Sequence, residues 1–307
     1  MLEVAIMIEG QNGLTWPRWQ NIVRLVEDLG FAGLYRSDHF TNARPPDKES
    51  LELWVSLTWL AANTSRIEFG PLVTPFSVRH PALTARMAAA VDDLSGGRLT
   101  LGLGAGWQER EHQVFGFDLL AMPDRFARFQ EGLECVTRLL QSADPVTFQG
   151  KYYHLDGAQL LPRPQRAGGP LILVGGNGYN RTLPLAARYA SEWNSDFLGP
   201  EDFSKASRHL DDLLTSAGRA PKSVRRSLMT GCMFASNKAD LEKNLTARGR
   251  TKEQLLEQGM IVGVGKEIQT QLQQLSEAGV QRIMLQWLDL DDLDGLAALA
   301  QTLLPHG

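Results

Sequence analysis

The sequence predicts a (β/α)8 TIM barrel that carries an insertion after its fourth strand. Strand-like and helix-like segments alternate along the chain, which is typical of a parallel sheet with crossover helices. Eight such units favour a closed barrel over an open sheet, and 307 residues suit a barrel of roughly 250 residues with an insertion. No linker rich in Pro, Gly and Ser interrupts the units, so we expect residues 1–307 to form one domain.

The first four units follow one another without a break. Apolar residues spaced along one helix face mark the first helix, Trp16–Leu29, which stops at Gly30. The strands expected in this half are Val4–Glu9, Gly33–Ser37, Arg66–Val73 and Arg98–Gly104. The other expected helices are Leu51–Ala62 and Pro81–Leu94.

The unit spacing breaks over residues 108–169, which we interpret as an insertion that decorates the barrel. A helix is expected over Arg125–Leu140, because its apolar residues share one face. The stretch Val146–His154 is typical of a hairpin, with its turn at Gln149-Gly150.

The alternation then resumes and completes the barrel. A longer helix is expected over Lys238–Gln258, followed by a glycine-rich turn at Gly263–Gly265. The remaining strands are expected at Leu171–Val174, Ser191–Ser195, Arg226–Ala235 and Arg282–Trp287. The remaining helices are expected at Thr182–Tyr189, Glu201–Ala217, Glu267–Ala278 and Leu293–Leu304.

Composition excludes several classes of function. The net charge is −4 and no basic cluster is present, which excludes a nucleic-acid partner. No apolar run approaches the roughly 20 residues that cross a bilayer, and the N-terminus lacks a signal peptide, so we expect a soluble, cytoplasmic protein. Cys135 and Cys232 are interpreted as reduced core thiols, and the histidines show no metal-ligand spacing.

The active site of such a barrel lies at the C-terminal ends of its strands. Glu9 ends the first strand, where it is either a site carboxylate or part of a solvated loop. Asp38 and His39 follow the second strand. A histidine there can move a proton near neutral pH, although a loop histidine paired with Asp38 is the alternative.

Proline and glycine mark three further strand ends. Pro71 and Pro75 restrict the backbone of the third, where a distorted strand could support a flat ring. The alternating glycines of 102–106 remove side chains from one face of the fourth, so that a large ligand can approach the backbone. Gly175–Gly178 precedes a helix, whose free N–H groups suit a phosphate. The alternatives are a merely stiff strand end at 71–75, a chance glycine motif at 102–106 and a simple tight turn at 175–178.

These segments, taken in order, resemble the bacterial-luciferase-like family of flavin monooxygenases and F420-dependent oxidoreductases. The matching stretches are LGFAGLYRSDHF (29–40), 64–117 with its LSGGRLTLGLGAGW run, the helix at 125–140, LPRP (161–164), 172–194 and AGVQRIMLQW (278–287). The resemblance covers nearly the whole chain.

The resemblance implies a barrel with the isoalloxazine ring at the strand C-termini and His39 close to the reactive ring carbon. It also implies a non-prolyl cis peptide between Pro71 and Leu72. The candidate catalytic residues are His39, Asp38 and Glu9. The candidate cofactor-binding residues are Asp38, His39, Pro71, Leu72, Thr74, Gly104, Ala105, Gly106, Gly175, Gly176, Asn177 and Gly178.

One position departs from the pattern of the F420-dependent sugar-phosphate dehydrogenases. They carry a glutamate immediately after the glycine that matches Gly106, whereas this chain has Trp107. The nearest carboxylates are Glu109 and Glu111. The substrate of that subgroup is therefore not carried over, and we expect Trp107 and Trp193 to line a more apolar pocket.

Three functions remain open at this point. The first is an oxidoreductase that exchanges a hydride between coenzyme F420 and a small organic substrate, with Arg125 and Arg181 as basic partners for the acidic tail of the coenzyme, unless they form only surface ion pairs. The second is a monooxygenase that uses reduced FMN and O₂. The third is a binding barrel without a cofactor. No metal is expected, and the family implies a homodimer.

Overall fold

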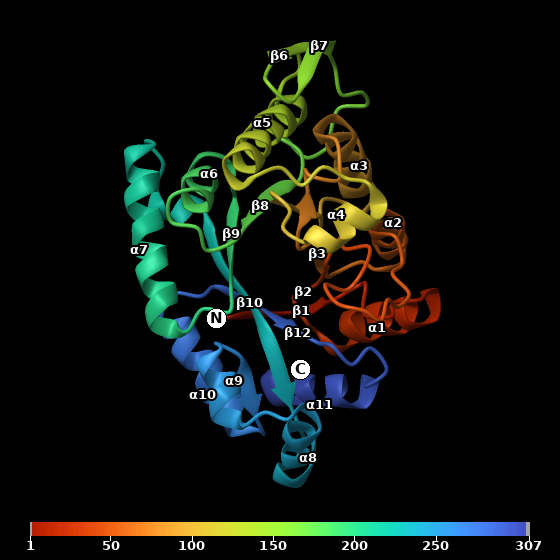
Figure 1. Cartoon of the computed structure of the whole chain (residues 1–307), viewed down its shortest axis with the longest axis vertical. Helices are drawn as coiled ribbons and strands as arrows, with labels where there is room; N and C mark the ends of the chain where they lie inside the picture. The colour runs from red at the N-terminus through yellow and green to blue at the C-terminus, as the bar shows by residue number, and fades with distance from the viewer. Residues whose placement is uncertain (1, 305–307) are drawn as a thin grey trace.

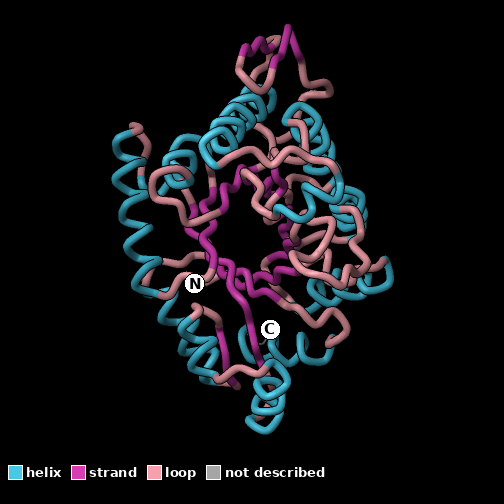
Figure 2. Tube along the Cα trace, in the orientation of Figure 1, coloured by secondary structure: helices cyan, strands magenta, loops and turns pink. Residues whose placement is uncertain are grey.

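A computed structural model describes residues 2–304 and confirms the barrel (Figure 1). Its parallel strands form one sheet that curls almost into a closed ring, with the helices arranged around the outside (Figure 2). The barrel strands are β1 (Glu3–Ile8), β2 (Gly33–Arg36), β3 (Glu68–Pro71) with its short continuation β4 (Thr74–Pro75), β5 (Thr100–Gly104), β8 (Leu171–Gly175), β9 (Glu192–Asp196), β10 (Arg225–Phe234) and β12 (Arg282–Gln286).

The order of the strands around the ring is β3-β2-β1-β12-β10-β9-β8-β5-β4. The seam lies between β3 and the start of β5, where the N–H of Phe69 donates to the carbonyl of Arg98 at 3.2 Å. β4 then pairs with the C-terminal end of β5, Thr74 beside Leu103. All C-terminal strand ends consequently meet at one mouth.

The helices cover the outer surface of the sheet. Large side chains fill the space between the two layers, among them Trp19, Phe129 and Phe203, each no more than 1% exposed. Burying one such side chain contributes about 1.5–3 kcal/mol. The helices are α1 (Trp16–Leu29), α2 (Leu53–Asn63), α3 (Pro81–Leu94), α4 (Glu109–Phe115), α5 (Met122–Gln141), α6 (Thr182–Tyr189), α7 (Pro200–Ser216), α8 (Lys238–Arg248), α9 (Lys252–Glu257), α10 (Lys266–Glu277) and α11 (Leu293–Leu303).

The insertion between β5 and β8 holds α4, α5 and an antiparallel hairpin of β6 (Val146–Gln149) and β7 (His154–Ala158), which projects beyond the barrel at the top of Figure 1. The hairpin was predicted, but its turn covers 150–153 and its second strand continues to Ala158. Helix α4 was not predicted. It is only two turns long, which is too short for a clear helical period.

The single helix predicted over Lys238–Gln258 is wrong. α8 ends at Arg248 and is capped by Gly249, whose φ of 61° is left-handed. α9 begins after Thr251, which forms a capping box with Gln254. The turn predicted at Gly263–Gly265 also contains the end of a short strand, β11 (Ile261–Gly263), which pairs with β10. Within residues 2–304, no helix has both the length and the apolar character that a bilayer crossing requires.

The N-terminal end of the barrel is closed by a charged cluster around Arg282, a residue that is 1% exposed. Its guanidinium donates to Glu3 at 2.8 Å and to Glu68 at 2.7 Å, and it lies 3.4 Å from Glu192. Burial raises the pKa of Glu192, against the opposing charge of Arg282. This cluster lies at the end opposite the mouth, so we interpret it as a determinant of stability.

Candidate functional site at the barrel mouth

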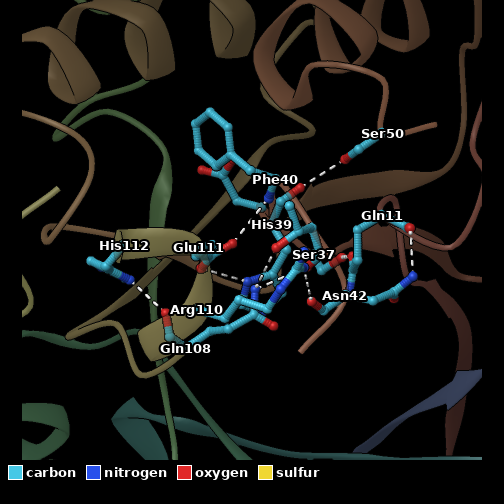
Figure 3. A network of polar contacts seen from close by, with 12 residues as sticks. Gln11, Ser37, His39, Phe40, Asn42, Ser50, Gln108, Arg110, Glu111 and His112 are labelled. Carbon is cyan, nitrogen blue, oxygen red and sulfur yellow. Dashed lines mark hydrogen bonds and ion pairs between the residues drawn. The ribbon is translucent and has the colours of Figure 1, made fainter. Parts of the chain in front are cut away.

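The centre of the site is a hydrogen bond between His39 and Glu111 (Figure 3). His39 follows β2, and its Nδ1 lies 2.9 Å from Oε1 of Glu111, in the first turn of α4. The other carboxylate oxygen, Oε2, accepts the backbone N–H of Phe40 at 3.0 Å. The pair is largely withdrawn from water, since the side chains of His39 and Glu111 are 16% and 1% exposed.

The surroundings of His39 favour its protonated form. Burial, the largest single effect, lowers the pKa of His39, and the hydrogen bond to Glu111 opposes it. The charges of Glu111, Glu9 and Asp38 also raise it, and together with the hydrogen bond they outweigh burial, so the pKa lies above its ordinary value. Because Nδ1 is bonded to Glu111, the ring is held in one orientation. Within residues 2–304, Nε2 has no hydrogen-bond partner and is the nitrogen left to exchange a proton.

Asp38 is not hydrogen-bonded to His39. Its carboxylate receives two hydrogen bonds from Arg79, at 2.6 and 2.7 Å, and a third from the hydroxyl of Thr74 at 2.9 Å. This bidentate ion pair ties the loop after β2 to the loop before α3. Thr74, predicted to bind the cofactor, is completely buried. That prediction is corrected, because the Thr74 hydroxyl supports Asp38 from beneath and does not line the mouth.

Glu9 lies at the end of β1 as predicted, and both of its oxygens are engaged. Oε1 accepts the side-chain amide of Gln286 at 2.7 Å, and Oε2 accepts that of Gln11 at 2.8 Å. Gln11 in turn accepts the hydroxyl proton of Ser37 at 2.6 Å. The carboxylate is therefore fixed between the first, second and last strands of the barrel.

The cis peptide predicted between Pro71 and Leu72 is wrong by one bond, since the cis bond joins Leu72 and Val73. The N–H of Leu72 still donates to the carbonyl of Arg36 at 2.8 Å. The ladder between β2 and β3 thus extends through the bond 71–72, and the departure from regular strand geometry begins after it.

Val73 occupies the space that the glycines of β5 leave open. A Cβ built on Gly104 would overlap Val73 Cγ2, and one built on Gly175 would lie 3.1 Å from Val73 Cγ1. A Cβ on Gly102 would overlap the carbonyl of Pro71. The glycines of β5 therefore make room for the segment between β3 and β4 to pack against β5. Val73, which is half-buried, forms part of the surface that a ligand at the mouth would contact.

The loop Gly175–Gly178 runs from β8 toward α6. Within residues 2–304, the N–H groups of Gly178, Tyr179 and Asn180 donate to no protein group. The side-chain amide of Asn177 makes two hydrogen bonds to the backbone of Asp196. It donates to the Asp196 carbonyl at 2.8 Å and accepts the Asp196 N–H at 3.1 Å. The loop is thus anchored by a side chain and leaves backbone amides open.

The two tryptophans predicted for a substrate pocket have different environments. Trp107 is 61% exposed and meets the His39 ring edge-on, with ring centroids 5.5 Å apart. Trp193 is fully buried, stacks on Phe203 and donates to the carbonyl of Gly176 at 2.9 Å. The prediction for Trp193 is wrong, because alternation along β9 turns this side chain outward against α7.

Other predicted residues border the mouth. Ala105 and Gly106 follow β5 and are half-buried, whereas Leu72 belongs to the apolar cluster inside the barrel. Arg125 donates to the carbonyl of Gly106 at 3.3 Å, and Arg181 lies over the ring of Phe126.

Sequence reasoning did not assign roles to Glu111, Arg79 or Gln286. Gln286 ends the last barrel strand, a position that could have identified it. Glu111 lies 72 residues after its partner His39, and Arg79 lies 41 residues after its partner Asp38. No local sequence pattern predicts either pairing.

Comparison with known proteins places these features in a family. A family model described as luciferase-like monooxygenase matches residues 3–299. The F420-dependent glucose-6-phosphate dehydrogenase of Kineococcus radiotolerans is 35% identical over 156 residues, which are 50% of this chain and 46% of that protein. The 5,10-methylenetetrahydromethanopterin reductase of Archaeoglobus fulgidus is 30% identical over 223 residues, which are 72% of this chain and 60% of that protein.

The chain spans about half the length of the first of these relatives. Among solved structures, an F420-dependent secondary alcohol dehydrogenase in complex with an F420-acetone adduct superposes with a TM-score of 0.87. The match covers 98% of both chains at 17% identity, which is a likeness of fold.

Proposed function

This chain belongs to the luciferase-like monooxygenase family, and we propose that within it the protein is an F420-dependent oxidoreductase acting on a small organic substrate. The observation that carries the proposal is the His39–Glu111 pair at the barrel mouth, with Nε2 of His39 free to exchange a proton. Of the two curated relatives described above, the first supports the choice of coenzyme, since its name states F420 dependence. The name of the second states a reductase activity, which supports the class of reaction.

The residues present fit such a coenzyme. When bound, a deazaflavin supplies a group that accepts or donates a hydride, which no amino-acid side chain does. The open amides of Gly178–Asn180 would hold its phosphate at the N-terminal side of α6. Val73 and the loop of Ala105 and Gly106 would support its ring system. Arg125, beside Gly106, would neutralise part of its acidic tail.

The chain itself would manage the proton that accompanies hydride transfer. Oxidation of an alcohol releases a hydride and a proton, and reduction of a carbonyl consumes both. Nε2 of His39 would take the proton in the first direction and give it in the second. Glu111 is a positioning residue here, because it fixes the ring through Nδ1 and stabilises the imidazolium form. Asp38 would hold the loop that carries His39 in place through its ion pair with Arg79.

The test is a fluorescence titration of the purified apo-protein with F420 and with FMN under identical salt. We expect F420 to bind with micromolar or tighter affinity and FMN at least ~10-fold more weakly, a difference of about 1.4 kcal/mol. The two cofactors share the ribityl phosphate, so the difference reports on the ring and the acidic tail. Tighter FMN binding, or FMN that copurifies stoichiometrically, would replace this proposal with the FMN-dependent monooxygenase.

We also propose that the protein acts as a homodimer. Large apolar side chains are exposed on the outer helices, including Val55 on α2 and Leu83 and Leu94 on α3. Light scattering coupled to size exclusion distinguishes a dimer from the 34.0 kDa monomer.

A further inference from the structure

Trp107 combines a direct contact with His39 and an indole that the protein leaves largely uncovered. Its ring meets the His39 ring edge-on, with centroids 5.5 Å apart and ring planes at 84°. The residue is nevertheless 61% exposed. Trp107 therefore touches the residue that we propose exchanges the proton, and most of its remaining surface is open to a ligand.

The residues on either side fix Trp107 in this place. The carbonyl of Gly106 accepts a hydrogen bond from Arg125 at 3.3 Å. On the other side, the buried Gln108 donates through its side-chain amide to the carbonyl of Thr41 at 2.9 Å. The backbone thus holds the indole in position although little of the indole itself is packed against protein.

The surroundings of His39 on this side of the mouth are aromatic. The next residue, Phe40, packs its ring on Phe115 and Phe117, with centroids 4.9 and 5.4 Å apart. Phe115 is itself exposed. The segment 107–117 therefore brings apolar rings to His39 and to the residue after it, so Trp107 is not an isolated apolar residue on the surface.

We propose that Trp107 is a substrate-contacting residue, which selects alcohols and carbonyl compounds that carry an apolar group next to the reacting carbon. A substrate oxygen hydrogen-bonded to Nε2 of His39 lies about 2.6–3.2 Å from that nitrogen. A group on the reacting carbon is then within reach of a ring that touches the imidazole. Apolar and aromatic groups gain by packing on an indole, whereas a hydroxylated group there loses water without an equivalent partner.

This inference rests on the proposed function, because it requires proton exchange at His39 with F420 bound. The test measures kcat/KM for F420-dependent oxidation of 2-propanol, 2-butanol, 2-pentanol and 2-hexanol, in which the hydride passes to the coenzyme and the proton to His39. Each alcohol adds one methylene to the group that would meet the indole. In wild type we expect kcat/KM to rise by up to about 4-fold per methylene, the factor for complete burial of one CH₂.

Variants of Trp107 should change this rise and not only the overall rate. In Trp107→Ala we expect kcat/KM to vary by less than ~2-fold across the series, whereas Trp107→Phe, which keeps an aromatic surface, should retain part of the rise. Trp16→Ala is the matched control, since the ring of Trp16 packs on Trp59 at 6.4 Å, and it should keep the wild-type rise.

Binding without turnover gives a second readout. In protein loaded with reduced F420, which cannot accept a hydride, the indole N–H resonance of Trp107 should shift on addition of 2-hexanol. That of Trp16 should not shift. Each resonance is assigned by its loss in the corresponding variant.

The outcomes separate a substrate contact from a mere cover over His39. Removal of a cover would change kcat/KM by the same factor for every alcohol, and a series that stays equally steep in Trp107→Ala would overturn the inference. A flat series in wild type that binds F420, or no turnover of any of these alcohols, would also overturn it and leave the choice of coenzyme standing. Tighter binding of FMN than of F420 would overturn the proposed function, and this inference with it.

Discussion

The carboxylate of Glu111 holds His39 and the residue after it at the same time, with Oε1 2.9 Å from Nδ1 of His39 and Oε2 accepting the N–H of Phe40 at 3.0 Å. One helix turn of the insertion thus fixes the loop after β2. The insertion is therefore part of the candidate site, and docking of α4 is a condition for a fixed histidine.

Removing the charge of Glu111 should lower the pKa of His39. In Glu111→Gln the burial of the ring is no longer opposed by a carboxylate at Nδ1, so we expect the pKa of His39 to fall. NMR titration of the imidazole C–H resonances measures it directly, with His39→Ala used for assignment. An unchanged pKa would show that Glu9 and Asp38 suffice to hold the charge.

The same pair should make stability depend on pH in a defined direction. The pKa of His39 is raised in the folded protein, so its contribution is complete below about pH 6.5 and is lost as pH rises through the folded-state value. Urea unfolding at a series of pH values, compared between wild type and Glu111→Gln, isolates this term. The difference in unfolding free energy should shrink as pH rises. A difference that grows with pH would contradict the sign.

Loss of His39 should affect turnover more than cofactor binding. His39→Ala removes the group that exchanges the proton, and we expect turnover to fall by about 10²-fold or more, the usual contribution of acid–base catalysis. The affinity for F420 should change far less. The assay uses F420 absorbance with whichever compound a screen of small alcohols and carbonyl compounds identifies. Turnover equal to wild type would reduce His39 to a loop residue.

Arg282 should be among the residues most important for stability. Arg282→Met leaves Glu3, Glu68 and Glu192 with Arg225 as their shared counter-charge, at 3.6 Å from each. Breaking a buried pair costs about 3–5 kcal/mol, which sets the upper end of the expected loss. Adding Glu192→Gln should recover part of the loss, because it removes the most buried of the three charges. Arg138→Met, in an exposed ion pair, is the control and should stay within about 0.5 kcal/mol of wild type.

Gly104 should tolerate no side chain. In Gly104→Ala the new Cβ would overlap Val73, so overpacking should cost about 1–3 kcal/mol and displace the floor of the mouth. We expect weaker F420 binding as well as a lower unfolding midpoint. Gly199→Ala is the matched control, since its Cβ would meet open space and its φ is −70°. Equal effects of the two substitutions would exclude a packing role for Gly104.

Most of the fold could be predicted from local sequence patterns. The predicted bounds of α1, α3 and α6 agree with the structure at both ends. Apolar periodicity marks all three helices in the sequence itself, and Pro or Gly near the ends also marks α1 and α3. The two-turn helix α4 and the break between α8 and α9 lacked a sufficient period, and both were missed.

The sequence by itself also determined which strand ends carry polar or glycine residues, and hence that Glu9, His39 and the loop after β8 lie at one mouth. Only the tertiary structure decided what each of them contacts. His39 pairs with Glu111, Asp38 with Arg79, and the space beside Gly104 is filled by Val73. Secondary structure follows from neighbours along the chain, whereas these pairings depend on how helices and loops dock around a closed sheet, and local sequence does not encode that docking.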